Sequence, residues 1–328
     1  MKLNLESARR ILVRAPNWLG DAIMSLPAIK GLAEIFEPPE LAVVAPASLD
    51  GLFERYGFIN EVHYITKKNS FGAHKALAGK YDAMFLFTNS FRSALHALAA
   101  KCPVRVGYGG NFRGPLLTNV MPKLKRVHMV DYYLNLVRPF GVRMFGQNAD
   151  FPLLPEEAAF AENISGLDDA VAIPLGARYG SAKCWPHRQL KAFIKLAAGD
   201  DRRVVLLGTN SDEMQGEALE DVAPTKITNL VGKTTIGQMA AVMARCAWVV
   251  ANDSGPLHVA GATGVKTIAI FGPTDHSRTA PMADCVRLVT QNSDCAPCFK
   301  RECNGDHHCM EEISAEEIYS IMRTDEKN

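Results

Sequence analysis

Short apolar runs rich in Val, Ile and Leu alternate along the chain with longer segments whose apolar positions recur at helical spacing. Because such runs suit buried strands, the pattern predicts strands joined by helices, and therefore parallel sheets covered on both faces. A final helix is expected from Ser314, where Ser-Ala-Glu-Glu forms a capping box with Glu317. The expected strands are 11–16, 41–46, 62–66, 83–88, 104–108, 170–175, 202–208, 227–232, 248–253 and 266–272.

Two complete α/β units are expected, because Pro152 and Pro155 interrupt the rhythm in FPLLPEEAAF, 151–160. A chain of 328 residues also suits two domains of ~150 residues each. The predicted fold class is therefore α/β, with doubly wound, Rossmann-like parallel-sheet domains at 1–152 and 153–328. The carboxyl ends of the two sheets are expected to face one another across a cleft.

Charge is divided unevenly between the halves. Residues 1–150 hold 19 Lys and Arg against 11 Asp and Glu, a net charge of +8, which leaves −7 for the remainder. The basic half suits an anionic partner such as a phosphorylated lipid, a membrane surface or nucleic acid, although scattered solvated charges give the same sum. No signal-peptide apolar region and no membrane-spanning run is present, which predicts a cytosolic protein that is at most peripheral to a membrane.

Several nucleotide-binding motifs are absent. No GxGxxG opens either half, and VGKTT at 231–235 lacks the first Walker A glycine because Ile227 stands there. This speaks against a P-loop NTPase and a simple NAD enzyme. No Asp-x-Asp is present to hold a cation on a nucleotide diphosphate. Any diphosphate is therefore expected to rely on backbone amides, hydroxyls and a lysine.

The stretch WVVANDSGPLHVAGATG, 248–264, predicts an anion site where a strand turns into a helix. Pro256 suits the first helical turn, whose free amides attract an anion. Ser254 can add a hydroxyl, and His258 follows it four residues later on the same helical face. The alternative is that the loop only caps the helix and that His258 packs in the core. The loop residues are Asn252, Asp253, Ser254 and Gly255.

A second loop of this kind is PLGARYGSAKCWPHRQL, 174–190, which enters a helix near Pro186. Gly176 and Gly180 allow close approach, Ser181 offers a hydroxyl, and Lys183 supplies a charge for a phosphate. The alternative is an ordinary turn with a solvated lysine.

In the first half, Asp21 directly follows the turn glycine Gly20 in RAPNWLGDAIMSLPAIKGL, 14–32. Its type and position suit a helix N-cap. They equally suit a general base at the expected cleft, and the two roles are compatible.

A polar loop region, TNSFRSALHALAAKCPVRVGYGGNFRG, follows the fourth and fifth expected strands. Its arginines suit a phosphate or carboxylate on an acceptor, and the alternative is surface arginines around a crossover. The polar candidates in it are Asn89, Ser90, Arg92, Arg105 and Arg113.

Four cysteines cluster in CAPCFKRECNGDHHCM near the end of the chain, at Cys295, Cys298, Cys303 and Cys309. They are compatible with a structural zinc site, with reduced thiols or with disulfides. The scattered cysteines, Cys102, Cys184, Cys246 and Cys285, are expected to be small core residues.

Taken together, RAPNWLGDAIMSLPAIKGL, the 88–114 stretch, GARYGSAKCWPH and VVANDSGPLHVAGATGVKTIAIFGPTD resemble the lipopolysaccharide heptosyltransferases, type II more closely than type I. The resemblance implies a GT-B fold and inverting, metal-independent transfer of L-glycero-D-manno-heptose from ADP-heptose, with no cofactor required. The implied acceptor is the phosphorylated heptosyl-Kdo2-lipid A core, at the cytoplasmic face of the inner membrane and without nucleic acid. A type I enzyme, a nucleotide-sugar 2-epimerase and a non-catalytic lipid A or nucleotide-binding protein are the alternatives.

The resemblance also implies roles for residues. It makes Asp21 the catalytic base and Lys183 the phosphate-binding lysine, whereas Asn210 stands where type I enzymes carry an acidic ribose contact, so Asp212 or Glu213 is the candidate there. The implied donor-binding residues are Gly176, Lys183, Thr209, Asp253, Ser254, Gly255 and His258, and the implied acceptor-binding residues are Asn17, Trp18, Asn89, Ser90, Arg92 and Arg113.

Overall fold

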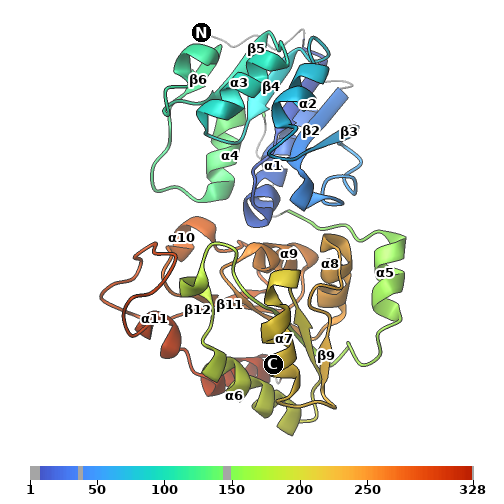
Figure 1. Ribbon diagram of the computed structural model, residues 1–328, viewed down its shortest axis with the longest axis vertical. Coiled ribbons are helices and arrows are strands. Elements are labelled where there is room, and N and C mark those ends of the chain that lie inside the picture. Colours follow the sequence, from blue (N-terminus) through green and yellow to red (C-terminus); the bar gives the residue numbers. More distant parts are fainter. Residues whose placement is uncertain (1–7, 36–39, 143–148, 327–328) are drawn as a thin grey trace. The chain divides into compact units, whose positions relative to one another are not determined.

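The computed structural model describes residues 8–35, 40–142 and 149–326, and the chain divides into two compact units, Met1–Ala149 and Asp150–Asn328. Within the described residues, each unit contains one six-stranded, all-parallel sheet flanked by helices (Figure 1). This is the doubly wound α/β fold expected from the alternating apolar runs.

In the first unit the strand order is β3-β2-β1-β4-β5-β6, so the crossover direction reverses between β1 and β4. The carboxyl edge of the sheet at such a reversal is where open α/β sheets usually bind their ligands. The elements are β1 (Arg10–Arg14), α1 (Leu19–Ile35), β2 (Glu40–Pro46), β3 (Glu61–Ile65), α2 (Ser70–Ala76), β4 (Ala83–Leu86), α3 (Phe91–Ala99), β5 (Val104–Tyr108), β6 (Asn119–Met121) and α4 (Met129–Val137).

Helix α1 is held on this sheet by close packing against α4. Its side chains Ile23, Leu26 and Ile29 are buried, and each fully buried aliphatic side chain stabilises the fold by about 1.5–3 kcal/mol. At Gly31 an added Cβ would lie 2.4 Å from Cγ1 of Val142, so glycine is what lets the two segments approach. The position of α1, and of its first turn at the carboxyl edge, is therefore fixed by its core contacts.

The second unit repeats this plan with the strand order β12-β11-β10-β7-β8-β9. The order reverses between β10 and β7, whose carboxyl ends lie side by side. The elements are α5 (Pro155–Glu162), β7 (Val171–Pro174), α6 (His187–Gly199), β8 (Val204–Leu207), α7 (Glu213–Glu220), β9 (Ile227–Asn229), α8 (Ile236–Arg245), β10 (Trp248–Asn252), α9 (Gly255–Thr263), β11 (Thr267–Phe271), α10 (His276–Thr279), β12 (Val286–Thr290), α11 (His308–Glu311) and α12 (Ala315–Asp325).

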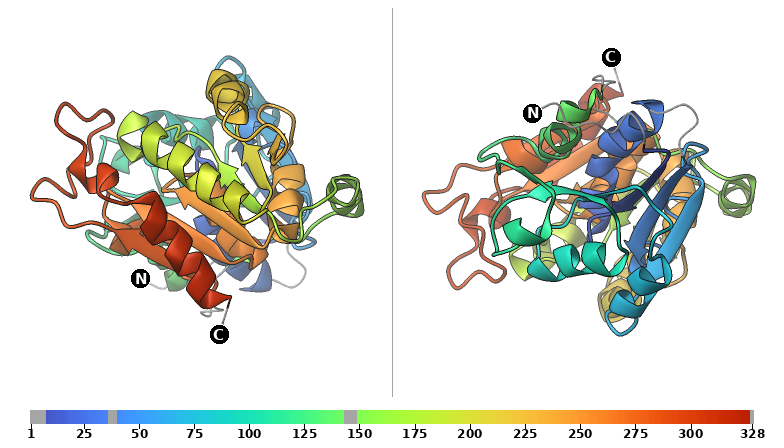
Figure 2. Two further views of the ribbon diagram at one scale, coloured as in Figure 1. Left: turned by 90° about the horizontal axis from the view of Figure 1, so that it is seen from below. Right: turned by 90° about the horizontal axis from the view of Figure 1, so that it is seen from above.

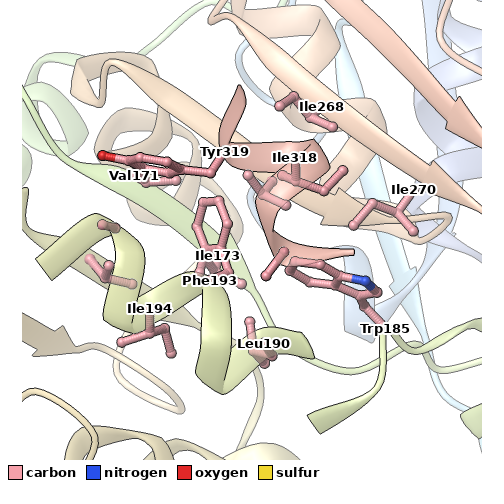
Figure 3. Packing of buried hydrophobic residues seen from close by; sticks show 14 of the residues in the cluster. Val171, Ile173, Trp185, Leu190, Phe193, Ile194, Ile268, Ile270, Ile318 and Tyr319 are labelled. Atoms are coloured by element: carbon pink, nitrogen blue, oxygen red, sulfur yellow. The ribbon is translucent and has the colours of Figure 1, made fainter. Parts of the chain in front are cut away.

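Aromatic side chains join α6 and α12 to this second sheet. The ring of Phe193 meets Trp185 at 5.8 Å and Tyr319 at 6.0 Å, both edge to face (Figure 3). The two helices consequently lie next to one another on the sheet, as the left view of Figure 2 shows in yellow-green and red.

All ten expected strands are confirmed, and Ser314 caps the last helix by accepting from the amide of Glu317 at 3.1 Å. The pattern missed β6 and β12. Both are edge strands with largely half-buried or exposed side chains, so neither carries a strong apolar signal. In the described part of the chain, no helix combines the length and apolar character needed to cross a bilayer.

Candidate functional site

In the second unit the predicted anion-binding loops meet at the carboxyl ends of β7 and β10. The side chain of Asn252, the last residue of β10, accepts a hydrogen bond of 2.9 Å from the amide of Trp185. This bond fixes the end of the loop that carries Lys183 against the loop that begins α9.

Lys183 and Asp253 form a close ion pair, with Nζ 2.5 Å from Oδ2. Only 13% of the lysine side chain and 6% of the aspartate side chain are exposed. The hydroxyl of Thr274 donates to the same carboxylate oxygen at 2.6 Å. Burial strengthens such a pair only when its other polar atoms are satisfied, and here Asp253 sets the position of the lysine ammonium.

The start of α9 offers an anion a second set of donors. Ser254 occupies the N-cap position, but its side chain makes no cap bond, and among the described residues its hydroxyl is buried without a hydrogen-bond partner. The carboxylate of Asp253 is held by Lys183 and Thr274. The simple capping interpretation is therefore wrong for the Ser254 side chain, and a helix N-terminus such as this one attracts anions.

Gly176 and Thr209 are drawn together by Asp212. An added Cβ on Gly176, where φ is +67°, would lie 2.4 Å from Oδ1 of Asp212. The amide and hydroxyl of Thr209 donate to the other oxygen at 2.9 and 2.8 Å. Asp212 thus joins the loops after β7 and β8. His258 is 5% exposed in α9, as its core interpretation expects.

In the first unit, Asp21 lies in the first turn of α1 and is half-buried. The helix begins at Leu19, so the expectation that Asp21 is its N-cap is wrong. The hydroxyl of Tyr133, on α4, donates to Oδ1 of Asp21 at 3.1 Å. Burial and the neighbouring carboxylate hold the pKa of Tyr133 well above its usual range, so the phenol stays a donor. Nothing in the sequence pattern connects these two helices, and sequence reasoning missed Tyr133.

The loop that leads to Asp21 is anchored by a buried guanidinium. Arg14, at the end of β1, donates to the carbonyl of Ala15 and to Oδ1 of Asn17, the latter at 2.7 Å. Burial lowers the pKa of Arg14 to about 10. Asn17 and Trp18 are exposed beyond this anchor, with 43% of Trp18 accessible to solvent.

The polar residues after β4 line the same carboxyl edge. Asn89 donates to the hydroxyl of Tyr132 at 2.8 Å, and Ser90 caps α3 by accepting from the amide of Ser93 at 3.1 Å. Arg92 is exposed. Of the arginines in this region it is therefore the one whose charge faces solvent, since Arg105 donates to the carbonyls of Leu116 and Cys102.

Arg113 does not face solvent, which corrects its expected role as an acceptor-binding group. Its side chain has 0% exposure, and Nη1 donates to the carbonyl of Thr88. An added Cβ on Gly107 would lie 2.1 Å from Nη2, so glycine provides the room for the guanidinium. Through the bond to Thr88, Arg113 supports the loop that carries Asn89 and Ser90 from the buried side.

Two buried histidines lie in this unit. The rings of His74 and His96 stack with centroids 4.3 Å apart, and Nε2 of His96 lies 3.3 Å from the hydroxyl of Ser70. Burial, followed by the charges of His74, Arg14 and Arg92, lowers the pKa of His96 to about 4. The pair is therefore neutral near pH 7.

All four clustered cysteines are free thiols, with Cys309 buried, Cys298 half-buried, and Cys295 and Cys303 exposed. Within the described residues, no three His, Cys, Asp or Glu side chains are arranged to hold a metal ion. The four thiols, as they are placed in this structure, do not form a zinc site. Zinc binding therefore stays a prediction from the sequence. The scattered cysteines Cys102 and Cys246 are buried, and Cys184 and Cys285 are half-buried.

Known proteins of one family match this chain over most of its length. The sequence model of glycosyltransferase family 9 (heptosyltransferase) matches residues 72–308. Lipopolysaccharide heptosyltransferase 2 of Escherichia coli K12 is 30% identical over 309 residues, covering 86% of this chain and 88% of the relative. Lipooligosaccharide heptosyltransferase 2 of Campylobacter jejuni serotype O:6 is 27% identical and covers 96% and 98%.

A solved structure is similar over almost the same length. The structure of E. coli ADP-heptose lps heptosyltransferase II superimposes with a TM-score of 0.83 at 25% identity, covering 97% of this chain and 100% of that one. The fold is thus shared over almost the whole chain.

Proposed function

Because the chain belongs to glycosyltransferase family 9, the heptosyltransferases of lipopolysaccharide and lipooligosaccharide cores, we propose that it transfers L-glycero-D-manno-heptose from ADP-heptose to heptosyl-Kdo2-lipid A. The proposed transfer inverts the anomeric carbon and needs no metal. The observation that carries the proposal is the Lys183–Asp253 pair beside the unpartnered Ser254 hydroxyl at the start of α9.

On the donor side, the diphosphate of ADP-heptose binds the Lys183 ammonium, the Ser254 hydroxyl and the first amides of α9. These groups neutralise the negative charge that grows on ADP as the bond from the anomeric carbon to the phosphate oxygen breaks. Their positions are set before substrate arrives, since Asp253 and Asn252 already hold the two loops. Preorganisation of this kind lowers the barrier to departure of ADP.

On the acceptor side, Asp21 acts as general base. It takes the proton of a heptose hydroxyl while the oxygen of that hydroxyl forms a bond to the anomeric carbon, opposite the departing ADP. The electron pair of the broken bond leaves on the diphosphate. Tyr133 donates to Oδ1 of Asp21 and so holds the carboxylate in a defined orientation for this proton transfer.

The phosphorylated lipid acceptor is assigned to the first unit, because the first 150 residues of the chain have a net charge of +8. Aromatic side chains are exposed in loops or first helical turns that follow β1, β3, β4 and β5, and Arg92 is exposed among them. Such a surface suits both the saccharide and the anionic membrane in which the acceptor is embedded, which supports peripheral association with the cytoplasmic face of the inner membrane. These side chains are Trp18, Phe71, Phe91 and Phe112.

The test is release of ADP from ADP-heptose with two acceptors, Kdo2-lipid A and heptosyl-Kdo2-lipid A, in the presence of EDTA. We expect rapid release only with the heptosylated acceptor, and NMR of the product should report the inverted anomeric configuration. Release with the shorter acceptor would indicate a type I enzyme, and conversion of the donor alone would indicate an epimerase. Binding of both substrates without ADP release would contradict an enzymatic role.

Asp21→Asn tests the general base. We expect its kcat to fall about 10³-fold with ADP affinity unchanged, because the amide cannot accept the proton. Asp50→Asn, a change to an exposed carboxylate of the same unit, is the matched control. Near-normal transfer by a folded Asp21→Asn enzyme would overturn the assignment.

A further inference from the structure

The cysteine-rich segment 295–309 is hydrogen-bonded along the loop that carries Lys183. The hydroxyl of Tyr179 donates to the carbonyl of Phe299 at 2.7 Å, and the amide of Ala182 donates to the carbonyl of Arg301 at 3.0 Å. Nε2 of His307 lies 2.8 Å from the carbonyl of Ala182. Because these three contacts lie within short stretches of both segments, they hold the cysteine-rich segment against the loop that carries Lys183.

Gly180 permits this contact. A Cβ at that position would lie 2.2 Å from the carbonyl oxygen of Arg301, so any other residue would separate the two backbones. The segment also reaches the other side of the site, because the amide of Phe299 donates to the carbonyl of Pro273 at 2.8 Å. Pro273 directly precedes Thr274, which donates to Asp253. Residues 299–301 therefore bridge both loops that set the Lys183–Asp253 pair.

This bridge brings a second cation to the Lys183 loop. The ring of Tyr179 contacts two cationic groups: Nζ of Lys183 lies 4.8 Å from its centroid and Cζ of Arg301 lies 5.4 Å from it. Aromatic rings attract cations at such distances, so one ring fixes both. The Arg301 side chain is exposed, unlike that of Lys183, and its guanidinium donors are the kind that fork onto phosphate oxygens.

The charges of the site and of a nucleoside diphosphate favour a second cation near Lys183. The ammonium of Lys183 is paired with the carboxylate of Asp253, which offsets part of the positive charge that the lysine offers to a diphosphate. A nucleoside diphosphate carries several negative charges, and they increase at the leaving oxygen as the sugar departs. Amides and the Ser254 hydroxyl supply only partial charges. A second full cation next to Lys183 would offset more of this negative charge.

We propose that Arg301 is a second diphosphate-binding cation of the donor site, presented by Tyr179 and by the backbone of the cysteine-rich segment. The proposal rests on the proposed function, because it assigns a further contact to the same nucleotide-diphosphate donor. On this proposal the cysteine-rich segment contributes to donor binding through Arg301 and its backbone, and not through its thiols.

The experiment is equilibrium binding of ADP and of adenosine to the full-length protein and its Arg301→Gln variant. We expect ADP to bind about fivefold more weakly to Arg301→Gln, the size of one partly solvated ion pair, and adenosine to bind equally well. Lys300→Gln removes the same charge from the neighbouring residue and should keep the wild-type affinity for ADP. Tyr179→Leu, which removes the ring, should reproduce the selective loss for ADP.

The outcomes separate the two proposals. If the wild-type protein binds ADP no better than adenosine, the proposed donor site itself fails. If the wild type prefers ADP but Arg301→Gln binds it equally well, or if Lys300→Gln loses as much, the role of Arg301 is overturned. Unchanged thermal unfolding of Arg301→Gln would show that a selective loss for ADP does not arise from a disturbed fold.

Discussion

The hydroxyl of Tyr133 donates a hydrogen bond of 3.1 Å to Oδ1 of Asp21, although the two residues stand 112 positions apart in the chain. Tyr133 is buried on α4, and Asp21 lies in the first turn of α1. The bond holds the carboxylate of Asp21 through Oδ1. It thus fixes the direction in which the proposed base accepts its proton.

Replacing this tyrosine tests that orientation. We expect Tyr133→Phe to lower kcat about tenfold, because a hydrogen bond to a charged group contributes about 1.5–3 kcal/mol and part of that orients the base. The KM for ADP-heptose should stay constant, since the proposed donor-binding residues lie in the second unit. Tyr132→Phe, at the adjacent position, is the control. It removes the hydroxyl that accepts a hydrogen bond from Asn89 and leaves the bond to Asp21 in place. Steady-state kinetics with both substrates distinguish the two variants.

The Lys183–Asp253 pair predicts a difference between single and double variants. Lys183→Met leaves a buried carboxylate without its cation, so we expect unfolding free energy to fall by about 3 kcal/mol and ADP affinity to fall about 100-fold. Lys183→Met/Asp253→Asn should regain most of the stability but not the affinity. Thermal unfolding and calorimetric titration with ADP measure the two quantities. Restored ADP binding in the double variant would mean that the lysine only neutralises Asp253.

The room that Gly107 leaves for Arg113 predicts a local effect on the first unit. Gly107→Ala places a methyl 2.1 Å from Nη2 of Arg113, so the guanidinium has to move and the Thr88 carbonyl loses its donor. We expect a loss of about 1–3 kcal/mol in stability and a lower kcat/KM for the acceptor, with ADP binding unaffected. Gly114→Ala, where an added Cβ meets nothing within 4 Å, should be neutral.

The buried histidines predict a pH dependence of stability. His96 has a pKa of about 4 in the fold and an ordinary value of 6.5, so between these pH values the unfolded chain binds a proton that the folded chain does not. Stability should therefore fall as pH decreases from about 6.5 towards 4, by about 2 kcal/mol near pH 5. His96→Phe, which keeps a ring against His74, should reduce this slope, whereas His276→Gln at an exposed site should not. Urea unfolding at about pH 7.5 and about pH 5 measures it.

Much of the architecture follows from local pattern, because buried parallel strands read as continuous apolar runs and helices as periodic ones. The edge strands β6 and β12 were missed because their side chains are only partly buried. The two candidate anion-binding loops could be predicted because glycine, proline and hydroxyl residues at a strand-to-helix turn are the residue types that suit an anion there.

The remaining parts of the site depend on contacts that sequence distance conceals. In the sequence, Arg113 looks like a solvent-exposed arginine of a loop. Only the tertiary structure shows that its side chain is buried and donates to the carbonyl of Thr88. Tyr133 and Arg301 belong to segments far from the residues they support. Which helix packs on which, and which backbone passes beside a glycine, are tertiary facts, and they decide these three roles.

Each sheet is assembled from one uninterrupted stretch of chain, with β7 to β12 all following residue 150 and α12 returning to pack on α6. The Lys183–Asp253 pair, Ser254 and Arg301 lie in that same stretch. In evolutionary terms, a single recombination between the coding sequences of two relatives, near the codon for residue 150, exchanges the second unit as a whole. Such an exchange would carry the complete proposed donor site with it and leave the proposed acceptor surface of the first unit unchanged.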